Sequence, residues 1–186
     1  MKIKILIVVA FIIIAISAVT YDMYSQPNMI TAPQNNVQTA MSLPNITAPL
    51  LLNEGDLNIH NLKEPIILLN FWASWCTVCM AEMDDLFKLV SDMDGKVALV
   101  TLSIDEVPEH ALKAYKFLEA RYPESIQNKH IYWLFDADKN ISLKTFNVNK
   151  TPETIIIDHQ RNMVDKIVGV YDWSSESIRQ KLKSYL

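Results

Sequence analysis

Both cysteines of this 186-residue chain, Cys76 and Cys79, lie in one four-residue window, and the flanking sequence leaves few folds open. The window follows the apolar run PIILLNFWA (65–73), whose length and continuity predict a strand buried on both faces. Apolar residues then recur at helical spacing from 76 to about 93, with acids between them. The sequence therefore predicts that both cysteines lie where a buried strand passes directly into a helix.

The rest of the chain alternates between strand and helix patterns. The further predicted strands span 96–104, 130–136, 153–158 and 163–170, and the last two form a hairpin. The further predicted helices span 108–122 and 141–148. Ser174 or Ser175 is expected to cap a last helix that carries Ile178 and Leu182. This order predicts an α/β fold in which a sheet is covered on both faces.

Residues 1–21 have the pattern of an export signal or a membrane anchor. Lys2 and Lys4 precede an apolar run from residue 5 to residue 19. This run is short for a helix that spans a membrane, which needs about 20 apolar residues. The small residues that mark a cleavage site are poorly represented after it. We therefore favour an uncleaved anchor over a cleaved signal, and rank a buried core helix third.

A polar segment separates this predicted anchor from the predicted domain. From Tyr21 to about Leu50 the chain is rich in Pro, Asn, Gln, Thr and Ser without a sustained period, which is typical of a flexible tether. We assign 22–42 to a flexible linker and 43–186 to one folded domain. The formal net charge is −4 and no basic patch stands out, so nucleic acid is not an expected partner.

The position of the two cysteines favours redox chemistry. Unpaired N–H groups at a helix start stabilise negative charge, so Cys76 is expected to ionise readily and to attack a disulfide. Cys79, one turn further on the same face, can then resolve the mixed disulfide. A structural staple across so short a loop would contribute little, about 2 kcal/mol. A structural zinc site needs four ligands, usually with a second pair of Cys or His at a defined spacing. The four histidines of the chain show no such pairing, so zinc is not favoured: His60, His110, His130 and His159.

Three residues near the cysteines have both a structural and a functional interpretation. Trp72 is expected in the core, whereas Trp75 adjoins the cysteines and fits a recognition surface better. Glu82 follows Cys79 by three residues and so shares its helical face. Most glutamates are solvated surface acids, but a partly buried Glu82 would raise the pKa of the Cys79 thiol and exchange protons with it.

The segments NFWASWCTVCMAE (70–82) and TPETIIID (151–158) resemble a known family. They are similar to the membrane-anchored, thioredoxin-like thiol–disulfide oxidoreductases of the bacterial cell envelope, the TlpA/ResA/DsbE (CcmG) group. The resemblance runs from about Leu43 to the C-terminus, and its most specific element is Trp-Cys-x-x-Cys at a strand–helix junction. It implies a thioredoxin fold, a central mixed β-sheet flanked by helices on both faces.

The resemblance also implies roles for individual residues. Cys76 matches the exposed nucleophile and Cys79 the resolving cysteine, so that their disulfide is the redox-active group, with no other cofactor and no metal. Pro152 matches a cis-proline that lies against the two cysteines, and Thr151 offers backbone groups to a bound peptide. Glu82 matches an acid that the group uses beside its cysteines.

The chain departs from the family pattern at three places. Thr77 and Val78, expected with Trp75 at the substrate surface, lack the proline of many relatives, which leaves the reduction potential open. Asp84 stands where a proline often kinks the helix. The stretch from Tyr122 to His130 is longer than usual and is a candidate for shaping substrate choice.

The resemblance implies an enzyme that reduces disulfides in partner proteins, with an apocytochrome c as first candidate and copper-site cysteines of an oxidase as second. A membrane thiol electron donor would have to reduce the enzyme again, because exported compartments are oxidising. The expected location is the bacterial cell envelope, with the anchor in the inner membrane and the domain in the periplasm or outside. Two other functions stay open: a disulfide-forming oxidase or isomerase, and a Cu(I)-binding chaperone.

Overall fold

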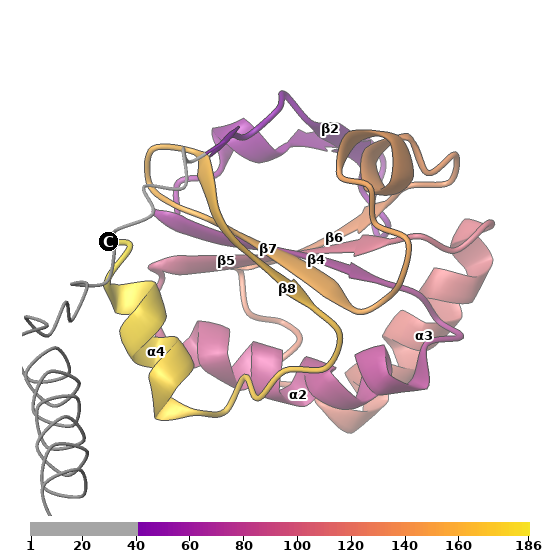
Figure 1. Ribbon diagram of the computed structural model, residues 1–186. Coiled ribbons are helices and arrows are strands. Elements are labelled where there is room, and N and C mark those ends of the chain that lie inside the picture. Colours follow the sequence, from indigo (N-terminus) through magenta and orange to yellow (C-terminus); the bar gives the residue numbers. More distant parts are fainter. Residues whose placement is uncertain (1–40) are drawn as a thin grey trace, which may run out of the picture. The chain divides into compact units, whose positions relative to one another are not determined.

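The computed structural model describes residues 41–186, which form a six-stranded mixed sheet and a small two-stranded sheet (Figure 1). The strand order of the larger sheet is β1-β8-β7-β4-β5-β6. Its strands are β1 (Met41–Ser42), β4 (Ile66–Trp72), β5 (Val97–Ser103), β6 (Ile131–Phe135), β7 (Glu153–Ile157) and β8 (Asn162–Val168). The smaller sheet pairs β2 (Thr47–Pro49) with β3 (Asp56–Asn58).

Helices and the small sheet cover the two faces of the larger sheet. The α-helices are α2 (Thr77–Asp92), α3 (Pro108–Arg121) and α4 (Glu176–Lys183), and all three lie on one face (Figure 1). The other face carries the β2–β3 sheet and two short helices, η1 (Ile59–Asn61, 3-10) and η2 (Asn140–Thr145, π). The predicted α/β architecture is confirmed, with the helices of the second face limited to these short turns.

The central strand β4 is buried along its whole length, which explains the continuous apolar run in the sequence. Because side chains alternate across a strand, Leu68 and Trp72 pack against the α-helices, while Leu69 and Phe71 pack in the cluster on the opposite face. Asn70 is the one polar residue of the strand, and it is fully buried. Its side chain therefore needs partners inside the fold.

One edge of the sheet collects the ends of several strands. Strands β4, β5 and β6 run parallel, so Trp72, Ser103 and Phe135 end at the same edge. Strand β7 runs antiparallel to β4, with Glu153 opposite Phe71, and therefore begins at that edge. We call this edge, where β4, β5 and β6 end and β7 begins, the carboxyl edge. The chain leaves β4 there and enters α2.

The folded domain begins before the predicted boundary. Met41 and Ser42, which were assigned to the linker, form β1 and pair with β8. Leu43, Ile46 and Ala48 are buried in the core of the second face, so the predicted tether does not continue to Leu50. The predicted anchor (1–21) and the linker up to residue 40 lie outside the described residues. Among residues 41–186, no helix is both long and apolar enough to cross a membrane.

The start of α4 differs from expectation in one detail. Ser175 occupies the N-cap position, but its hydroxyl makes no capping bond to the helix. It donates instead to the carbonyl of Asp172, at 2.8 Å. The Ser175 hydroxyl thus stabilises the turn before the helix and, contrary to the prediction from the sequence, does not cap the helix.

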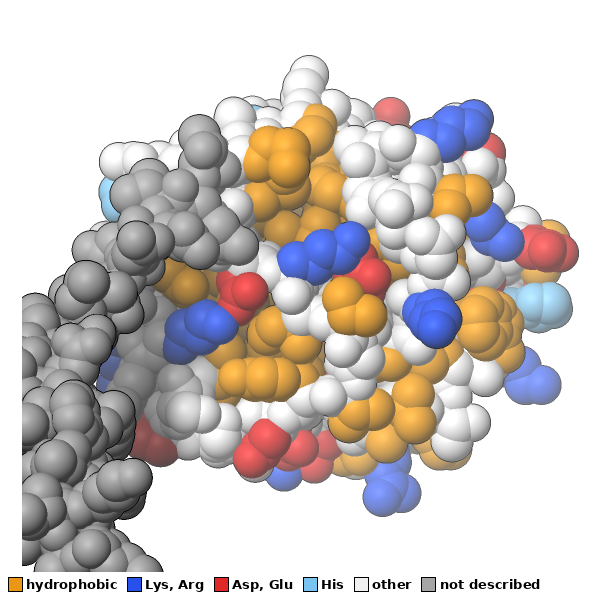
Figure 2. Space-filling view, viewed as in Figure 1, with side chains coloured by type: hydrophobic (Ala, Val, Ile, Leu, Met, Phe, Trp, Pro, Cys, Tyr) orange, Lys and Arg blue, Asp and Glu red, His pale blue; other side chains and the backbone are white. Residues whose placement is uncertain are grey.

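The surface of the domain mixes both signs of charge. Figure 2 shows one face, on which Lys and Arg side chains are interspersed with Asp and Glu and with hydrophobic side chains. This distribution agrees with the small net charge of the whole sequence, −4.

Replacing Ile46 tests whether the segment before Leu50 belongs to the core. Ile46→Ala should lower the free energy of unfolding by about 2 to 5 kcal/mol, because it leaves a cavity in a packed cluster. Met41→Ala, at an exposed site in the same segment, should change it by less than about 0.5 kcal/mol. Urea unfolding of both variants measures the difference. Equal, small effects would show that the segment does not contribute to the core.

Candidate active site

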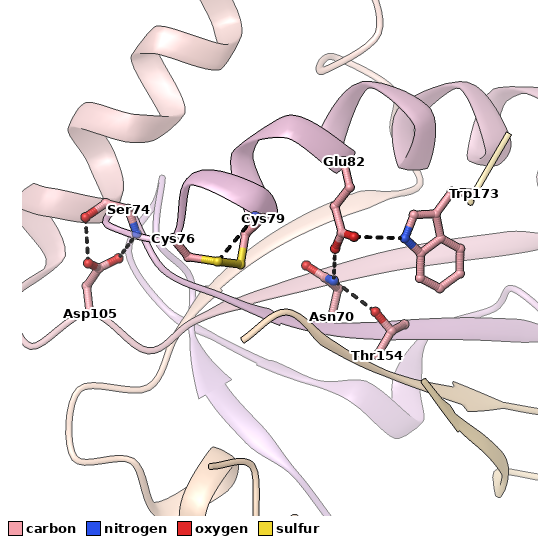
Figure 3. Close-up of a disulfide and its surroundings, with 8 residues drawn as sticks. All are labelled: Asn70, Ser74, Cys76, Cys79, Glu82, Asp105, Thr154 and Trp173. Carbon is pink, nitrogen blue, oxygen red and sulfur yellow. Dashed lines mark hydrogen bonds between the residues drawn. A yellow bond between two sulfur atoms is a disulfide. The ribbon is translucent and has the colours of Figure 1, made fainter. Parts of the chain in front are cut away.

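The two cysteines form a disulfide at the start of α2 (Figure 3). Cys76 is the N-cap residue of the helix, and its sulfur accepts a hydrogen bond from the backbone N–H of Cys79 at 3.2 Å. Cys76 is only 6% exposed and Cys79 is 0% exposed, so the expected exposed nucleophile is largely covered while the disulfide is closed. Any approach to the bond is therefore from the Cys76 side.

The loop between β4 and α2 places Cys76 at the carboxyl edge. The Cys76 N–H donates to the Ala73 carbonyl at 3.0 Å, which makes a tight turn directly after the strand. The Cys76 carbonyl then accepts the Met80 N–H at 3.1 Å, the first bond of the helix. The Cys79 N–H of the first helical turn consequently points at the Cys76 sulfur, at the helix start that the sequence predicted.

Exposed side chains surround this disulfide. Trp75 is 66% exposed and Val78 is 46% exposed, although both are apolar, and Thr77 between the cysteines is exposed as well. Exposed apolar side chains beside a reactive bond are suited to contact a partner protein. The three residues expected at a substrate surface therefore lie on the surface.

The Thr151–Pro152 peptide bond is cis, as the resemblance implied. Pro152 directly precedes β7, and the pairing of Glu153 with Phe71 puts it at the carboxyl edge, where the chain turns from β4 toward the cysteines. Thr151 is partly exposed at this edge.

Two exposed valines at the same edge were not singled out in the sequence. Pro152 accepts a hydrogen bond from the Gly169 N–H at 2.9 Å, which fixes the chain between Val168 and Val170 beside the cis-proline. Both valines are exposed. The feature of the sequence that could have indicated this turn is Gly169, which lies between the two valines. Its φ of 86° is a backbone conformation that favours glycine.

Glu82 is buried in the helix face that also carries Cys79, with only 6% of its surface exposed. Asn70 Nδ2 donates to its Oε1 at 3.4 Å, and Trp173 Nε1 donates to its Oε2 at 3.3 Å (Figure 3). Burial raises the pKa of Glu82 to about 7, even though the bonds from Trp173 and Asn70 favour the carboxylate. Glu82 can therefore take up and release a proton near neutral pH.

The partners of Glu82 come from distant parts of the chain. Asn70 lies on β4 and also donates to Thr154 Oγ1 on β7, at 2.9 Å. Trp173 follows β8 and is buried. A polar residue inside an apolar run was a visible signal for Asn70, whereas nothing in the spacing connects Trp173 with Glu82, 91 residues away.

The stretch from Tyr122 to His130 does not lie near the disulfide. It connects the end of α3 to the start of β6 and therefore occupies the edge of the sheet opposite the carboxyl edge. There Asn128 bonds to Ser91 at the end of α2, and Ile126 is buried in the core. The expectation that this stretch shapes substrate choice is wrong for contacts at the disulfide, because the parallel strands separate the two edges.

Within residues 41–186, no group of three or more His, Cys, Asp and Glu side chains is arranged to hold a metal ion.

Residues 38–182 match the family model described as Redoxin. The chain belongs to the Redoxin family. It is 28% identical over 189 residues to thiol-disulfide oxidoreductase ResA of Bacillus cereus, covering 100% of this chain and 96% of that protein. It is 31% identical over 134 residues to thiol:disulfide interchange protein DsbE of Pseudomonas aeruginosa, covering 72% of this chain and 65% of that protein.

Solved structures show that the fold is shared. The thioredoxin domain of a thiol-disulfide oxidoreductase from Bacteroides vulgatus has a TM-score of 0.62 at 18% identity and covers 77% of this chain and 96% of its own. A secreted disulfide oxidoreductase of Mycobacterium tuberculosis has a TM-score of 0.57 at 20% identity, with coverages of 76% and 96%. The predicted thioredoxin-like fold and the resemblance to the TlpA/ResA/DsbE group are confirmed. The redoxin is a thiol–disulfide oxidoreductase of the ResA/DsbE type with a Cys-x-x-Cys pair.

Neutralising Glu82 should change how stability depends on pH. The folded protein holds a raised pKa, about 7 against 4.5 for a free side chain, so it loses stability as pH rises through this window. The loss approaches about 3 kcal/mol above pH 7. Glu82→Gln lacks this titration and should gain stability relative to the wild type between pH 5 and pH 8.

Urea unfolding of the oxidised proteins at several pH values measures this difference. Glu54→Gln, at an exposed acid, is the control and should follow the wild-type curve. A constant difference between Glu82→Gln and the wild type from pH 5 to pH 8 would contradict the raised pKa.

Removing the indole donor should raise the pKa of Glu82 further. Trp173→Phe keeps an aromatic ring in the core but loses the N–H that stabilises the carboxylate. Since a hydrogen bond to a charged group is worth about 1.5 kcal/mol, the titration midpoint should move up by about one pH unit. NMR titration of the Glu82 carboxyl carbon in the oxidised protein measures it. The exposed Trp75→Phe variant should titrate as the wild type does.

Proposed function

We propose that the redoxin is a dithiol reductase of the bacterial cell envelope, in which Cys76 and Cys79 donate two electrons to disulfides of partner proteins. The observation that supports this direction of electron flow is the burial of Cys79 beside Glu82 on one helix face. Burial and a neighbouring carboxylate both disfavour a thiolate. When the thiolates are disfavoured, the reduced form of the protein is less stable relative to the disulfide form. The disulfide therefore has a lower reduction potential, and the dithiol is a stronger electron donor.

The reaction divides between the two sulfurs. The Cys76 thiolate, at the helix start, attacks one sulfur of the partner disulfide, and the other partner sulfur leaves as a thiolate and takes up a proton. The Cys79 thiol gives its proton to the Glu82 carboxylate and attacks the Cys76 sulfur. The second partner sulfur then leaves as a thiolate and takes up a proton from water, so the redoxin is oxidised while the partner gains two electrons and two thiols.

Glu82 fits this proton transfer because its pKa of about 7 lets both of its forms exist near neutrality. Trp173 and Asn70 donate to its two oxygens and so hold the carboxylate in a fixed orientation. When the enzyme is reduced again, the same carboxyl group can return the proton to the Cys79 sulfur.

The surface around Cys76 supports a protein substrate. Two segments come together at the carboxyl edge. One carries Trp75, Thr77 and Val78, and the other carries Thr151 and Pro152. The exposed apolar side chains would contact an extended segment around the partner disulfide, and the backbone of Thr151 would pair with it. Such a site selects an accessible disulfide in an unfolded chain over one inside a folded core.

The proposed substrate class is the haem-binding cysteine pair of an apocytochrome c, with copper-site cysteines of an oxidase as second candidate. A membrane thiol electron donor would return the oxidised redoxin to the dithiol form. The proposed placement has residues 1–21 in the inner membrane and the domain in the periplasm or outside. The similarity to proteins named ResA and DsbE supports the proposal that the redoxin acts on disulfides of other proteins.

Cysteine variants test the division of labour between the two sulfurs. The reduced wild type should reduce a peptide that carries an internal Cys-x-x-Cys-His disulfide, while Cys76→Ser should lose this activity at least about a thousandfold, because the attacking sulfur is gone. Cys79→Ser should form a mixed disulfide between Cys76 and the peptide that persists, visible by mass spectrometry as the sum of both masses.

Two further measurements test the other two functions. Rapid oxidation of the reduced peptide by the disulfide form, without the reverse reaction, would favour an oxidase. Sub-micromolar Cu(I) binding that is lost in Cys79→Ser would favour a copper chaperone. Full peptide reduction by Cys76→Ser would reject Cys76 as the nucleophile.

A further inference from the structure

A second buried carboxylate lies on the other side of the disulfide from Glu82. Asp105 follows β5 at the carboxyl edge and is only 1% exposed. Its Oδ2 accepts from the Ser74 N–H at 2.9 Å and from the Ser103 hydroxyl at 2.8 Å, and its Oδ1 accepts from the Ser74 hydroxyl at 2.7 Å. Figure 3 shows the disulfide between this group and the Glu82 group.

The hydrogen bonds of Asp105 tie it to the loop that carries Cys76. Ser74 is two residues before Cys76, so their Cα atoms are at most about 7.6 Å apart. Both the backbone and the side chain of Ser74 are bound to the same carboxylate, which fixes the direction in which the chain leaves β4. The position of the Cys76 sulfur depends on that direction.

Asp105 has no positive partner among residues 41–186, since none of the ion pairs in this part of the chain includes it. Glu106, the next residue, is exposed and forms an ion pair with Lys139 at 4.0 Å. Two other carboxylates at this edge are buried: Asp136 accepts from the backbone N–H groups of Ile141 and Ser142, and Glu153 is paired with Lys166. A buried carboxylate without a counter-charge is costly, and its field is only weakly screened. Cys76 lies two residues after Ser74, which binds the Asp105 carboxylate through both its backbone and its side chain, so its sulfur is a group on which this field can act.

We propose that Asp105 is a positioning residue, which fixes the loop before Cys76 and whose negative charge restrains ionisation of the Cys76 thiol in the reduced enzyme. The helix start stabilises the Cys76 thiolate, and Asp105 opposes it from the strand side. Together with Glu82 beside Cys79, the charge makes the thiolate form less favourable at both sulfurs, while Cys76 at the helix start remains the sulfur that ionises more readily and attacks. The dithiol is thereby destabilised relative to the disulfide, which strengthens it as an electron donor.

This inference rests on the proposed role of Cys76 as the attacking thiol, and the test distinguishes the two. The reduced enzyme is alkylated with iodoacetamide at pH 6.5, and mass spectrometry identifies which cysteine reacts. Asp105→Asn keeps the shape of the side chain and removes its charge, while its amide nitrogen can no longer accept the bonds that reach that position. The rate of alkylation at Cys76 should rise at least about threefold, because the thiolate fraction rises.

The equilibrium with glutathione gives a second readout. Asp105→Asn should lower the equilibrium constant for oxidation of the dithiol about threefold, which corresponds to a potential about 14 mV higher, since a tenfold change is 29.6 mV. A loop that had merely lost its anchor would expose the nearly buried Cys76 sulfur and raise its alkylation rate by the same factor at every pH. A charge effect instead moves the pH at which the rate reaches half its maximum to a lower value, so the pH dependence of Cys76 alkylation separates the two.

Ser103→Ala is the matched control, because it removes one donor to Asp105 and keeps the charge. It should lower stability without raising the alkylation rate. Asp105→Ser, which is also neutral, replaces Asp105→Asn if that variant does not fold. An unchanged or higher pH midpoint of Cys76 alkylation in the neutral variants would overturn the inference alone. Alkylation of Cys79 instead of Cys76 in the wild type would overturn the proposed function as well.

Discussion

Strand β4 is buried on both faces and delivers the chain straight into α2 at the carboxyl edge of the sheet. Because β5, β6 and β7 pair beside it in a fixed register, the same edge receives Asp105 from the end of β5 and Pro152 from the start of β7. The helix start supplies the Cys79 N–H to the Cys76 sulfur. The packing of β4 thus brings the residues of the site together. The chemistry of the two sulfurs follows from the groups around the junction between β4 and α2.

Opposing electrostatic effects meet at this junction. The first turn of α2 favours a thiolate at Cys76, whereas burial and Glu82 disfavour one at Cys79. The asymmetry gives the two sulfurs different tasks, since one must attack and the other must hold its proton until the mixed disulfide has formed. Glu82, with a pKa of about 7, is matched to accept that proton near neutral pH.

The sequence predicted the part of the fold whose signals are local. The strand before the cysteines, the helix after them and the hairpin near the C-terminus follow from continuous or periodic apolar patterns. The segment before Leu50 was misassigned because Leu43, Ile46 and Ala48 stand among prolines, asparagines and threonines. Their burial depends on a sheet face that only the folded chain provides.

The site shows the same division. Cys76, Cys79 and Glu82 were found because helical spacing places them together, and the cis bond before Pro152 came from the family resemblance. Trp173, Thr154 and Asp105 were missed, because their contacts join positions that are 31 to 91 residues apart. The near-complete burial of Cys76 in the disulfide was missed as well, since exposure depends on packing around the loop.

A reduction potential measured for the domain against glutathione or dithiothreitol decides whether the surroundings of the sulfurs make this redoxin an electron donor. Disfavoured thiolates should give a value near about −250 mV or lower, in the range of reducing dithiol proteins. A value near about −120 mV, typical of proteins that form disulfides, would mean that the reduced sulfurs are stabilised, and the proposed direction of electron flow would be wrong.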